Sequence, residues 1–524
     1  MTTIRTRRQF LGDVSKGVLV ASVGAGMAAE LGLASPAVGG NDAPEALAFG
    51  DLEPLVCLMQ ETPVNRLLPV LVEKLKSGTD LRRLLAAAAL ANARTFGGED
   101  YVGFHTMMAL APAYHMSTEL PEAQRPLPVF KVLYRNTNRI QEHGGRKGEV
   151  LHPVDPATTE FADVDAAGVA LRQAVRGQEM EKAERLFAGA VRKSPDDAFN
   201  ELLVAVQDTP EVHRVVLPYR AWDLLDLIGR EQAHTLLRQS VRYCVKAESW
   251  HRPGDLDEAR TVLPKMFDEH KLLDKSPGTR CASDHWIEKM SQTIFRATPA
   301  QAADAAAGAL AEGFSADDLG QAICLAANQL VLRDAGRAFR DEVPGKPLGS
   351  VHGDSIGVHA CDSANAWRNL ARVASPRNAI ACLILGAYQV AVDRTARGGD
   401  FLNWEPLPLK QHVDGIKSTE PAVLLAEIES AVRGNLQARA SAIVHRYGQL
   451  DLPERPLLDL MLRFATSEDG ALHAEKYYRT TSEEFAATRP AFRWRQLTAL
   501  ARVTASEYGR PAPGYAEARE LLKV

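Results

Sequence analysis

Apolar residues recur every three or four positions along most of this chain. Between residues 171 and 190 they form two such stripes, at Leu171, Ala174 and Val175 and then at Ala183, Leu186, Phe187 and Ala190. This spacing places the apolar side chains on one face of a helix. Residues 82–92 consist largely of strong helix formers, whereas alternating β-branched runs are scarce. The pattern therefore predicts an all-α protein built from many packed helices.

Short blocks of sequence occur twice in the same order. Ala-Val-Arg-Gly at 174–177 recurs at 431–434, and Leu-Leu-Asp-Leu at 224–227 recurs at 457–460. An alanine-rich helical stretch precedes a Gly-x-His sequence in each half, at His105 and at His359. From these histidines to the Ala-Val-Arg-Gly blocks the distances are 69 and 72 residues. The order of the blocks indicates an internal duplication.

The duplication predicts two related multi-helix lobes packed around a shared cleft. We expect the N-terminal lobe at residues 45–285 and the C-terminal lobe at residues 295–520. Because 524 residues exceed the size at which single cores usually divide, two lobes of this length are reasonable. His234 and His473 each follow a Leu-Leu-Asp-Leu block.

The first 37 residues have the features of an export signal. Arg7 and Arg8 precede Phe-Leu, an apolar stretch covers Val18–Ala34, and small residues follow. The paired arginines resemble the twin-arginine motif, whose pathway carries folded proteins. The resemblance implies a periplasmic or extracellular protein with the export machinery as a partner. The apolar stretch is short for a stable membrane span.

Composition excludes several classes of protein. Hydrophobic residues make up 46% and charged residues 24%, with a net charge of −5, which is typical of a globular protein and gives no basic excess for nucleic acid. The sequence contains no H-E-x-x-H, G-x-S-x-G or P-loop motif. Six cysteines occur without a C-x-x-C pair. Zincins, α/β-hydrolases, kinases and thioredoxin-like proteins are therefore disfavoured.

Histidines are the strongest candidates for chemistry. His105 and His115 lie ten residues apart in one predicted helix, and His352 and His359 flank a Gly-rich segment. Imidazoles with a carboxylate suit a non-haem transition metal ion, and imidazole is also an acid or base near neutral pH. We expect these four histidines as metal ligands, with His105 and His359 catalytic. Asp362, three residues after His359, is expected to orient its imidazole.

Three further residues are candidates for binding substrate. Arg368 and Trp367 follow His359 by about two turns, and Arg146 lies in a Gly-rich stretch. A guanidinium group can hold an anionic substrate or an oxyanion. The identity of the substrate, of any metal and of any other cofactor stays open.

The segment 357–368, Gly-Val-His-Ala-Cys-Asp-Ser-Ala-Asn-Ala-Trp-Arg, resembles the questin oxidase-like family. The segment from Gly-Phe-His at 103–105 to Tyr114 is similar to the other histidine segment of that family. Asp362 stands where the family pattern has Thr, and Trp367 where it has Leu. The resemblance implies a largely helical oxidoreductase that inserts oxygen into, or cleaves, an aromatic or quinone-like small molecule. His105 and His359 match the family positions.

The sequence thus favours an exported, monooxygenase-like oxidoreductase with histidines at the lobe interface. The alternatives are a non-catalytic α-helical repeat protein that binds a partner on a concave face, and a metal or haem carrier. The binding protein requires no cofactor, and the carrier loads its metal reversibly without turnover.

Overall fold

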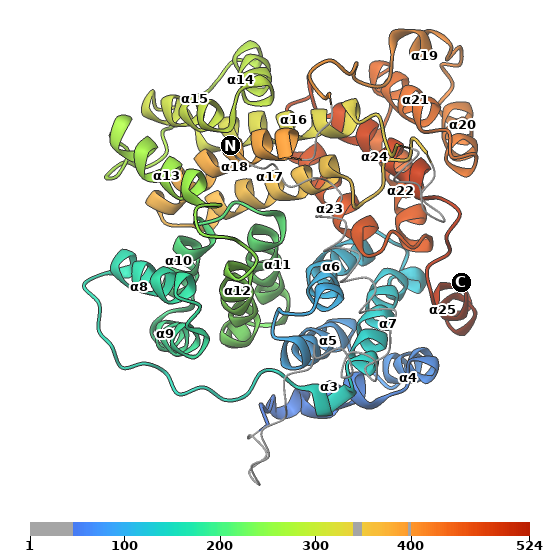
Figure 1. The fold of residues 1–524 in the computed structure, drawn as a ribbon. Coiled ribbons are helices and arrows are strands. Elements are labelled where there is room, and N and C mark those ends of the chain that lie inside the picture. Colours follow the sequence, from blue (N-terminus) through green and yellow to red (C-terminus); the bar gives the residue numbers. More distant parts are fainter. Residues whose placement is uncertain (1–45, 339–347, 397–399) are drawn as a thin grey trace. The chain divides into compact units, whose positions relative to one another are not determined.

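The computed structural model describes residues 46–338, 348–396 and 400–524 (Figure 1). The predicted signal peptide at residues 1–37 lies outside this part of the chain. Residues 47–524 form one compact unit. The division into lobes at residues 285 and 295 stays a prediction.

Helices make up the described part, which confirms the all-α prediction. The first ten are α3 (Glu53–Glu61), α4 (Val64–Lys76), α5 (Leu81–Phe96), α6 (Tyr101–Thr118), α7 (Pro126–Glu142), α8 (Val164–Arg176), α9 (Met180–Lys193), α10 (Pro195–Val206), α11 (Val212–Ile228) and α12 (Ala233–Glu248). Three connecting helices follow: α13 (Asp257–Glu269), α14 (Asp284–Arg296) and α15 (Pro299–Ala311). β-structure among the described residues is limited to isolated bridges.

The remaining helices repeat the order of the first set. They are α16 (Ala316–Arg333), α17 (Ile356–Val373), α18 (Pro376–Ala396), α19 (Lys410–Asp414), α20 (Pro421–Arg433), α21 (Gln437–Gln449), α22 (Glu454–Ser467), α23 (His473–Ala487), α24 (Trp494–Glu507) and α25 (Tyr515–Leu522). Helix α5 packs on α6, α6 on α7 and α11 on α12, just as α16 packs on α17, α17 on α18 and α23 on α24. With α19 as an insertion, α5–α12 therefore correspond to α16–α24.

The turns between α8 and α9 and between α20 and α21 show the duplication in atomic detail. The N–H of Gly177 donates to the carbonyl of Gln173, and the N–H of Gly434 donates to that of Ser430. The next residue is left-handed in both turns, with φ of 55° at Gln178 and 53° at Asn435. The repeated Ala-Val-Arg-Gly block thus forms the same helix–turn–helix twice.

The helix order also corrects two of the expected correspondences. The Leu-Leu-Asp-Leu blocks lie at the end of α11 and at the start of α22, so they are not equivalent. Since α11 corresponds to α23, the counterpart of His473 is His213 and not His234. Matches of four residues between helices arise easily when leucine is frequent in both.

Polar caps fix the beginnings of the two helices that carry the predicted histidines. Asp100 accepts a hydrogen bond from the N–H of Gly103 at 2.7 Å, which starts α6. Ser355 accepts one from the N–H of Val358 at 3.4 Å, which starts α17. Both caps satisfy N–H groups that a helix end leaves without a partner. As a result His105 and His359 lie in the second turn and at the end of the first turn of their helices.

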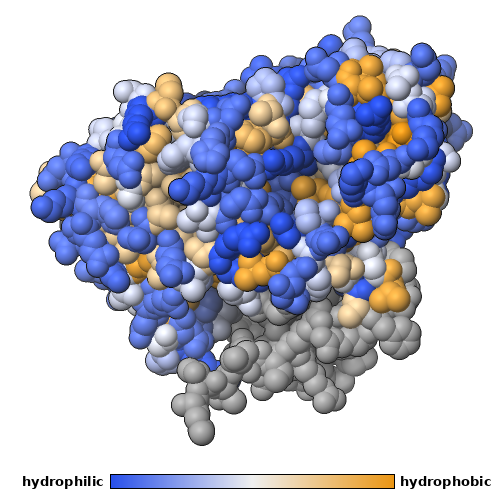
Figure 2. Space-filling view, turned by 90° about the horizontal axis from the view of Figure 1, so that it is seen from above, coloured by the Kyte–Doolittle hydropathy of each residue, from blue (hydrophilic) through white to orange (hydrophobic). Residues whose placement is uncertain are grey.

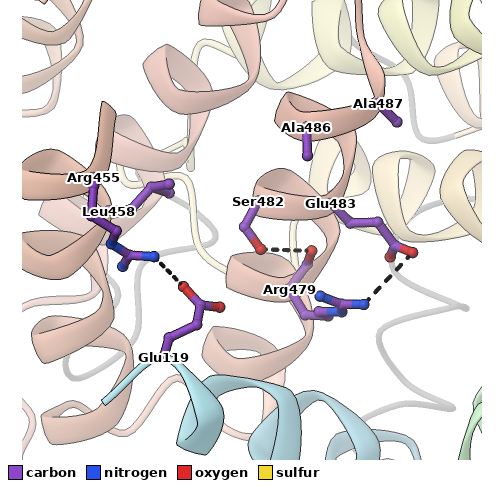
Figure 3. A pocket seen from close by; sticks show the side chains of 8 residues that line it. All are labelled: Glu119, Arg455, Leu458, Arg479, Ser482, Glu483, Ala486 and Ala487. Carbon is purple, nitrogen blue, oxygen red and sulfur yellow. Dashed lines mark hydrogen bonds and ion pairs between the residues drawn. The ribbon is translucent and has the colours of Figure 1, made fainter. Parts of the chain in front are cut away.

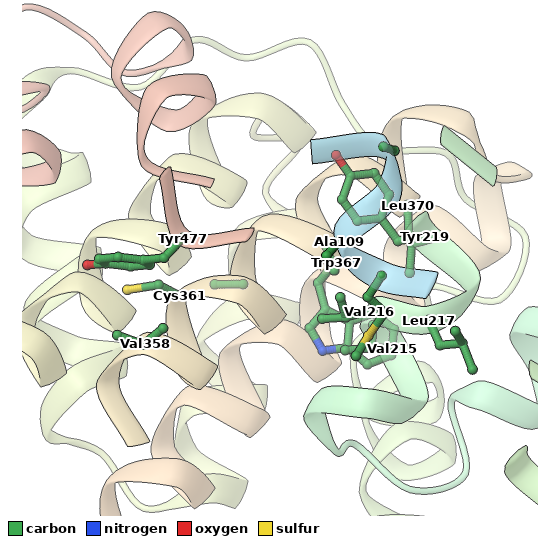
Figure 4. Packing of buried hydrophobic residues seen from close by; sticks show 14 of the residues in the cluster. Ala109, Val215, Val216, Leu217, Tyr219, Val358, Cys361, Trp367, Leu370 and Tyr477 are labelled. Carbon is green, nitrogen blue, oxygen red and sulfur yellow. The ribbon is translucent and has the colours of Figure 1, made fainter. Parts of the chain in front are cut away.

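Buried apolar side chains from both halves surround the site helices. Figure 4 shows Val215, Val216 and Leu217 of α11 close to Trp367 and Leu370 of α17, all of them buried. The surface seen in Figure 2 is mostly hydrophilic, with apolar side chains in scattered groups. Within the described ranges, no helix is both long enough and apolar enough to cross a bilayer.

Candidate functional site

Four histidines from four helices meet in the interior. His105 of α6 and His213 of α11 have ring centroids 4.8 Å apart, and His359 of α17 and His473 of α23 are separated by 5.2 Å. The two pairs join at 5.2 Å between His105 and His473 and at 5.9 Å between His213 and His359. The rings thus form a closed four-membered arrangement, to which each half of the duplication contributes two neighbours.

His105 is held in one tautomer by its own helix. Its Nδ1 lies 2.7 Å from the carbonyl oxygen of Tyr101, and because a carbonyl only accepts hydrogen bonds, Nδ1 carries the proton. Its Nε2 is buried and has no hydrogen-bond partner among the described residues. Burial lowers the pKa of His105 well below its usual value, and the charges of Lys476, His213 and His473 lower it further. His105 therefore presents a neutral Nε2 lone pair to the cluster.

His213 is oriented by a carboxylate. Glu211 accepts from His213 Nδ1 at 2.7 Å, from the Tyr243 hydroxyl at 2.8 Å and from the N–H groups of His213 and Arg214 at 3.0 Å each. Burial acts to raise the pKa of Glu211, but the charge of His213 and these hydrogen bonds outweigh it and lower the pKa to about 2. An ionised Glu211 fixes the Nδ1 proton of His213. The His213 Nε2 is likewise buried without a partner in the described part of the chain.

The other two histidines approach each other through Nε2 atoms. Nε2 of His359 lies 3.2 Å from Nε2 of His473, which suits one shared proton. It also suits a shared ion, because two metal–nitrogen bonds of about 2.1 Å enclosing about 100° place their nitrogens about 3.2 Å apart. His359 and His473 are 6% and 4% exposed. Nε2 is thus the atom through which these two rings meet.

The donor types of the cluster suit a transition metal, while its spacing is wider than that of a formed site. In the ranges that the structure describes, no three His, Cys, Asp or Glu side chains lie close enough to hold one ion. Neutral imidazoles whose opposite nitrogen is bonded to a carbonyl or a carboxylate are nevertheless the usual ligand form for iron, copper and zinc. His105 has this form, and Nδ1 of His213 is likewise bonded to a carboxylate.

A second layer of polar side chains lies further along three of the helices. Asp362, one turn after His359, accepts a hydrogen bond from Thr480 at 2.9 Å. Arg220, two turns after His213, donates to the same Thr480 hydroxyl at 3.4 Å. Lys476, one turn after His473, is 2% exposed. Burial raises the pKa of Asp362, against the opposing charges of Lys476 and Arg220. The hydrogen bond from Thr480 thus links Asp362 to Arg220.

Two of the predicted metal ligands lie outside the four-ring arrangement. His115 lies ten residues after His105 in α6 and pairs with Asp223 at 3.2 Å. His352 precedes α17 and is 4% exposed. Its neighbour Gly353 runs so close to His473 that a Cβ built there would lie 2.3 Å from the His473 Cβ. The segment of His352 thus packs against the cluster from outside.

The predicted substrate-binding residues have other partners. Arg146 is on the surface and pairs with Glu61 at 3.2 Å. Arg368 is buried and pairs with Glu484 at 2.6 Å and with Asp317 at 2.9 Å. The indole N–H of Trp367 donates to Gln389 at 2.7 Å within the core. Each of the three side chains thus has an ion-pair or hydrogen-bond partner within the protein.

Sequence reasoning found two of the four clustered histidines and missed His213 and His473. Neither has a local motif, and both begin a helix. The signal that identifies them is the repeat itself, because His213 follows His105 by 108 residues and His473 follows His359 by 114 residues. Lys476 and Arg220 were missed for the same reason.

A surface pocket lies on another face of α23 (Figure 3). Its volume is about 510 Å³, and it is lined by Glu119, Arg455, Leu458, Arg479, Ser482, Glu483, Ala486 and Ala487. Arg455 pairs with Glu119 at 2.8 Å, and Arg479 lies 3.8 Å from Glu483. None of the four clustered histidines lines this pocket.

Comparison with known proteins gives no relative. No family model, curated protein or solved structure matches the chain.

Proposed function

We propose that the protein is an oxidoreductase whose site is the cluster of His105, His213, His359 and His473. The observation that carries the proposal is the set of Nε2 atoms. Two of them are buried without a hydrogen-bond partner among the described residues, on rings held by Tyr101 and Glu211, and the other two are 3.2 Å apart. Nitrogen donors of this kind, held by separate helices, support binding of a redox-active transition metal.

The metal, when bound, would supply one-electron chemistry and activation of dioxygen. The chain would hold the His105 imidazole in its neutral form and exclude bulk water, since His105, His359 and His473 are nearly fully buried. Glu211 and Tyr243 would keep the His213 ring in one orientation. Because the cluster is wider than a formed metal site, binding would draw the four rings closer together.

The side of the cluster nearest solvent supports an aromatic or quinone-like substrate. His213 is 14% exposed and its partner Glu211 is 38% exposed. The ring of Tyr101, 59% exposed, packs 5.9 Å from that of His213, and Phe104 packs 5.1 Å from it. Aromatic walls favour a flat ring. The similarity of segments 103–105 and 357–368 to questin oxidase-like proteins points to the same class.

We infer export by the twin-arginine pathway from Arg7 and Arg8 alone. A cofactor inserted into the folded chain before transport is consistent with that pathway. A periplasmic or extracellular location is therefore part of this proposal.

The test is metal analysis of the full chain, purified without chelating resin, together with oxygen uptake on phenols and quinones. We expect near-stoichiometric iron, copper or manganese in the wild type and loss of the metal in His213→Ala and His359→Ala. The matched control is His234→Ala, because His234 is a partly buried histidine outside the cluster.

Retained metal in His213→Ala would refute the ligand assignment. A metal-loaded protein that consumes no oxygen with any phenol or quinone would favour the carrier over the enzyme. A metal-free protein with unchanged activity in His359→Ala would refute the proposed site altogether.

A further inference from the structure

Two buried cations lie beside the histidine cluster with unused hydrogen-bonding capacity. Lys476 is 2% exposed, and its ammonium group forms no hydrogen bond or ion pair with any residue that the structure describes. Arg220 is 1% exposed, and its Nε and Nη1 have no hydrogen-bond partner within the same ranges. A buried donor without a partner is costly. The two cations therefore have free donors in the protein interior.

Several carboxylates surround these cations. The charge of Asp362 acts on both Lys476 and Arg220, and its Oδ1 accepts a hydrogen bond from Thr480. The charge of Glu475 also acts on Lys476, and that of Glu483 also acts on Arg220. The nearest carboxylate oxygen to Arg220 is that of Asp223, at 3.7 Å, and Asp223 is also paired with His115. These carboxylates leave Nε and Nη1 of Arg220 without a hydrogen-bond partner among the described residues.

The duplication shows that the fold itself does not require these charges. When the histidines are aligned, Lys476 of α23 corresponds to Val216 of α11, and Asp362 of α17 corresponds to Met108 of α6. Val216 and Met108 are ordinary buried core residues, 2% and 1% exposed, and Figure 4 shows Val216 among its apolar neighbours. The second half has thus placed a charge where the first half has an apolar side chain.

Most of the polar side chains in this layer come from the second half of the duplication. Arg220 comes from the first half, and its counterpart in the second half is Thr480, to which it donates a hydrogen bond. Lys476, Asp362 and Thr480 all come from the second half. A polar layer on one side of an otherwise repeated arrangement would let an asymmetric small molecule bind in one orientation only.

We propose that Lys476 and Arg220 form a subsite for an anionic oxygen of the substrate, beside the four histidines. The subsite rests on the proposed function, since it places the substrate next to the cluster. Its ligand is the oxygen of an ionised phenol or of a carboxylate on a flat ring. Charged hydrogen-bond donors bind a negative oxygen strongly when the site excludes water. Burial lowers the pKa of Lys476 to about 8, against the charge of Asp362, so the ammonium form prevails at neutral pH.

Binding of three small probes to the full-length protein tests the subsite. The probes are 4-nitrophenolate, benzoate and the neutral nitrobenzene, with affinity measured by calorimetry. We expect at least one anion to bind about tenfold or more tightly than nitrobenzene, which corresponds to one or two charge-assisted hydrogen bonds. The anion that binds more tightly identifies the source of the oxygen.

Variants then assign the effect to the two cations. Lys476→Gln should weaken binding of the anion about tenfold and leave nitrobenzene unchanged, whereas Lys476→Arg should keep most of the affinity. Lys246→Gln, at a half-exposed lysine of α12, is the control and should change nothing. Arg220→Lys covers the second cation, and circular dichroism verifies that each variant is folded.

Equal affinity for anions and nitrobenzene, or an unchanged affinity in Lys476→Gln, would overturn the subsite. Loss of metal in Lys476→Gln would also overturn it, because Lys476 would then belong to the metal site. Anion binding is read without turnover. A wild type that holds no metal but binds the anion through Lys476 would therefore refute the proposed function and retain the subsite.

Discussion

Replacing Arg368 with methionine tests whether this residue supports the fold. Its guanidinium donates to Glu484 at 2.6 Å and to Asp317 at 2.9 Å. Glu484 is 3% exposed and Asp317 is 58% exposed. When Arg368 is removed, water can take its place at Asp317. The carboxylate of Glu484 would stay buried without a cation, and its strongest remaining hydrogen bond would come from Asn365 at 2.9 Å. Breaking a buried ion pair from one side costs about 3–5 kcal/mol.

The free energy of unfolding, measured in urea by circular dichroism at neutral pH, should therefore fall by about 3–5 kcal/mol in Arg368→Met. In the double variant Arg368→Met/Glu484→Gln the uncompensated charge is gone, and the loss should be only about 1–2 kcal/mol. With the single variant Glu484→Gln measured as well, the three values give the pairwise term of a double-mutant cycle. Metal content of the folded protein should be unchanged.

A loss below about 1 kcal/mol in Arg368→Met would refute this reasoning. A double variant as unstable as the single one would refute it as well. Weaker substrate binding at unchanged stability would instead restore the assignment of Arg368 to the substrate.

Two further substitutions test buried features elsewhere. Burial and the charge of Asp197 raise the pKa of Glu201 to about 7. The stability that Glu201 contributes is therefore fully present below the pKa of an unfolded glutamate and is lost as the pH rises through about 7. Glu201→Gln should therefore be more stable than the wild type at about pH 8, by about 1–3 kcal/mol, with the difference shrinking at about pH 5 in urea titrations. Gly353→Ala brings a Cβ within 2.3 Å of the His473 Cβ, and we expect metal affinity to fall about tenfold or more. In the control Gly308→Ala the new Cβ has no neighbour closer than 3.7 Å, so this variant should keep its metal affinity. Equal metal affinity in the two variants would refute the idea that close packing at Gly353 positions His473.

The fold class was predictable because it depends on local pattern. A period of three to four residues and a scarcity of alternating runs suffice to predict helices, and the structure confirms them. The turn at Gly177 and Gly434 was also detectable, since both copies keep the same four residues. The lobe boundaries stay a prediction, because the described residues from 47 onward form one compact unit.

The site was only half predictable. His105 and His359 were identifiable from the repeated Gly-x-His sequence, but His213 and His473 lie in helices whose relation appears only after the helices have been ordered. His115 was included because it shares a helix with His105. A helical period places two side chains on nearby faces, yet it does not say how far along the helix a partner helix reaches. His115 pairs with Asp223 instead.

The four clustered histidines lie far apart in the sequence, with 368 positions between His105 and His473. No fragment that ends before His473 can contain the whole cluster. A ligand that binds the complete cluster and not the unfolded chain would stabilise the compact unit as a whole, by about 4 kcal/mol at a thousandfold excess over its dissociation constant. Occupancy of the cluster would then report that both halves of the molecule have folded and joined.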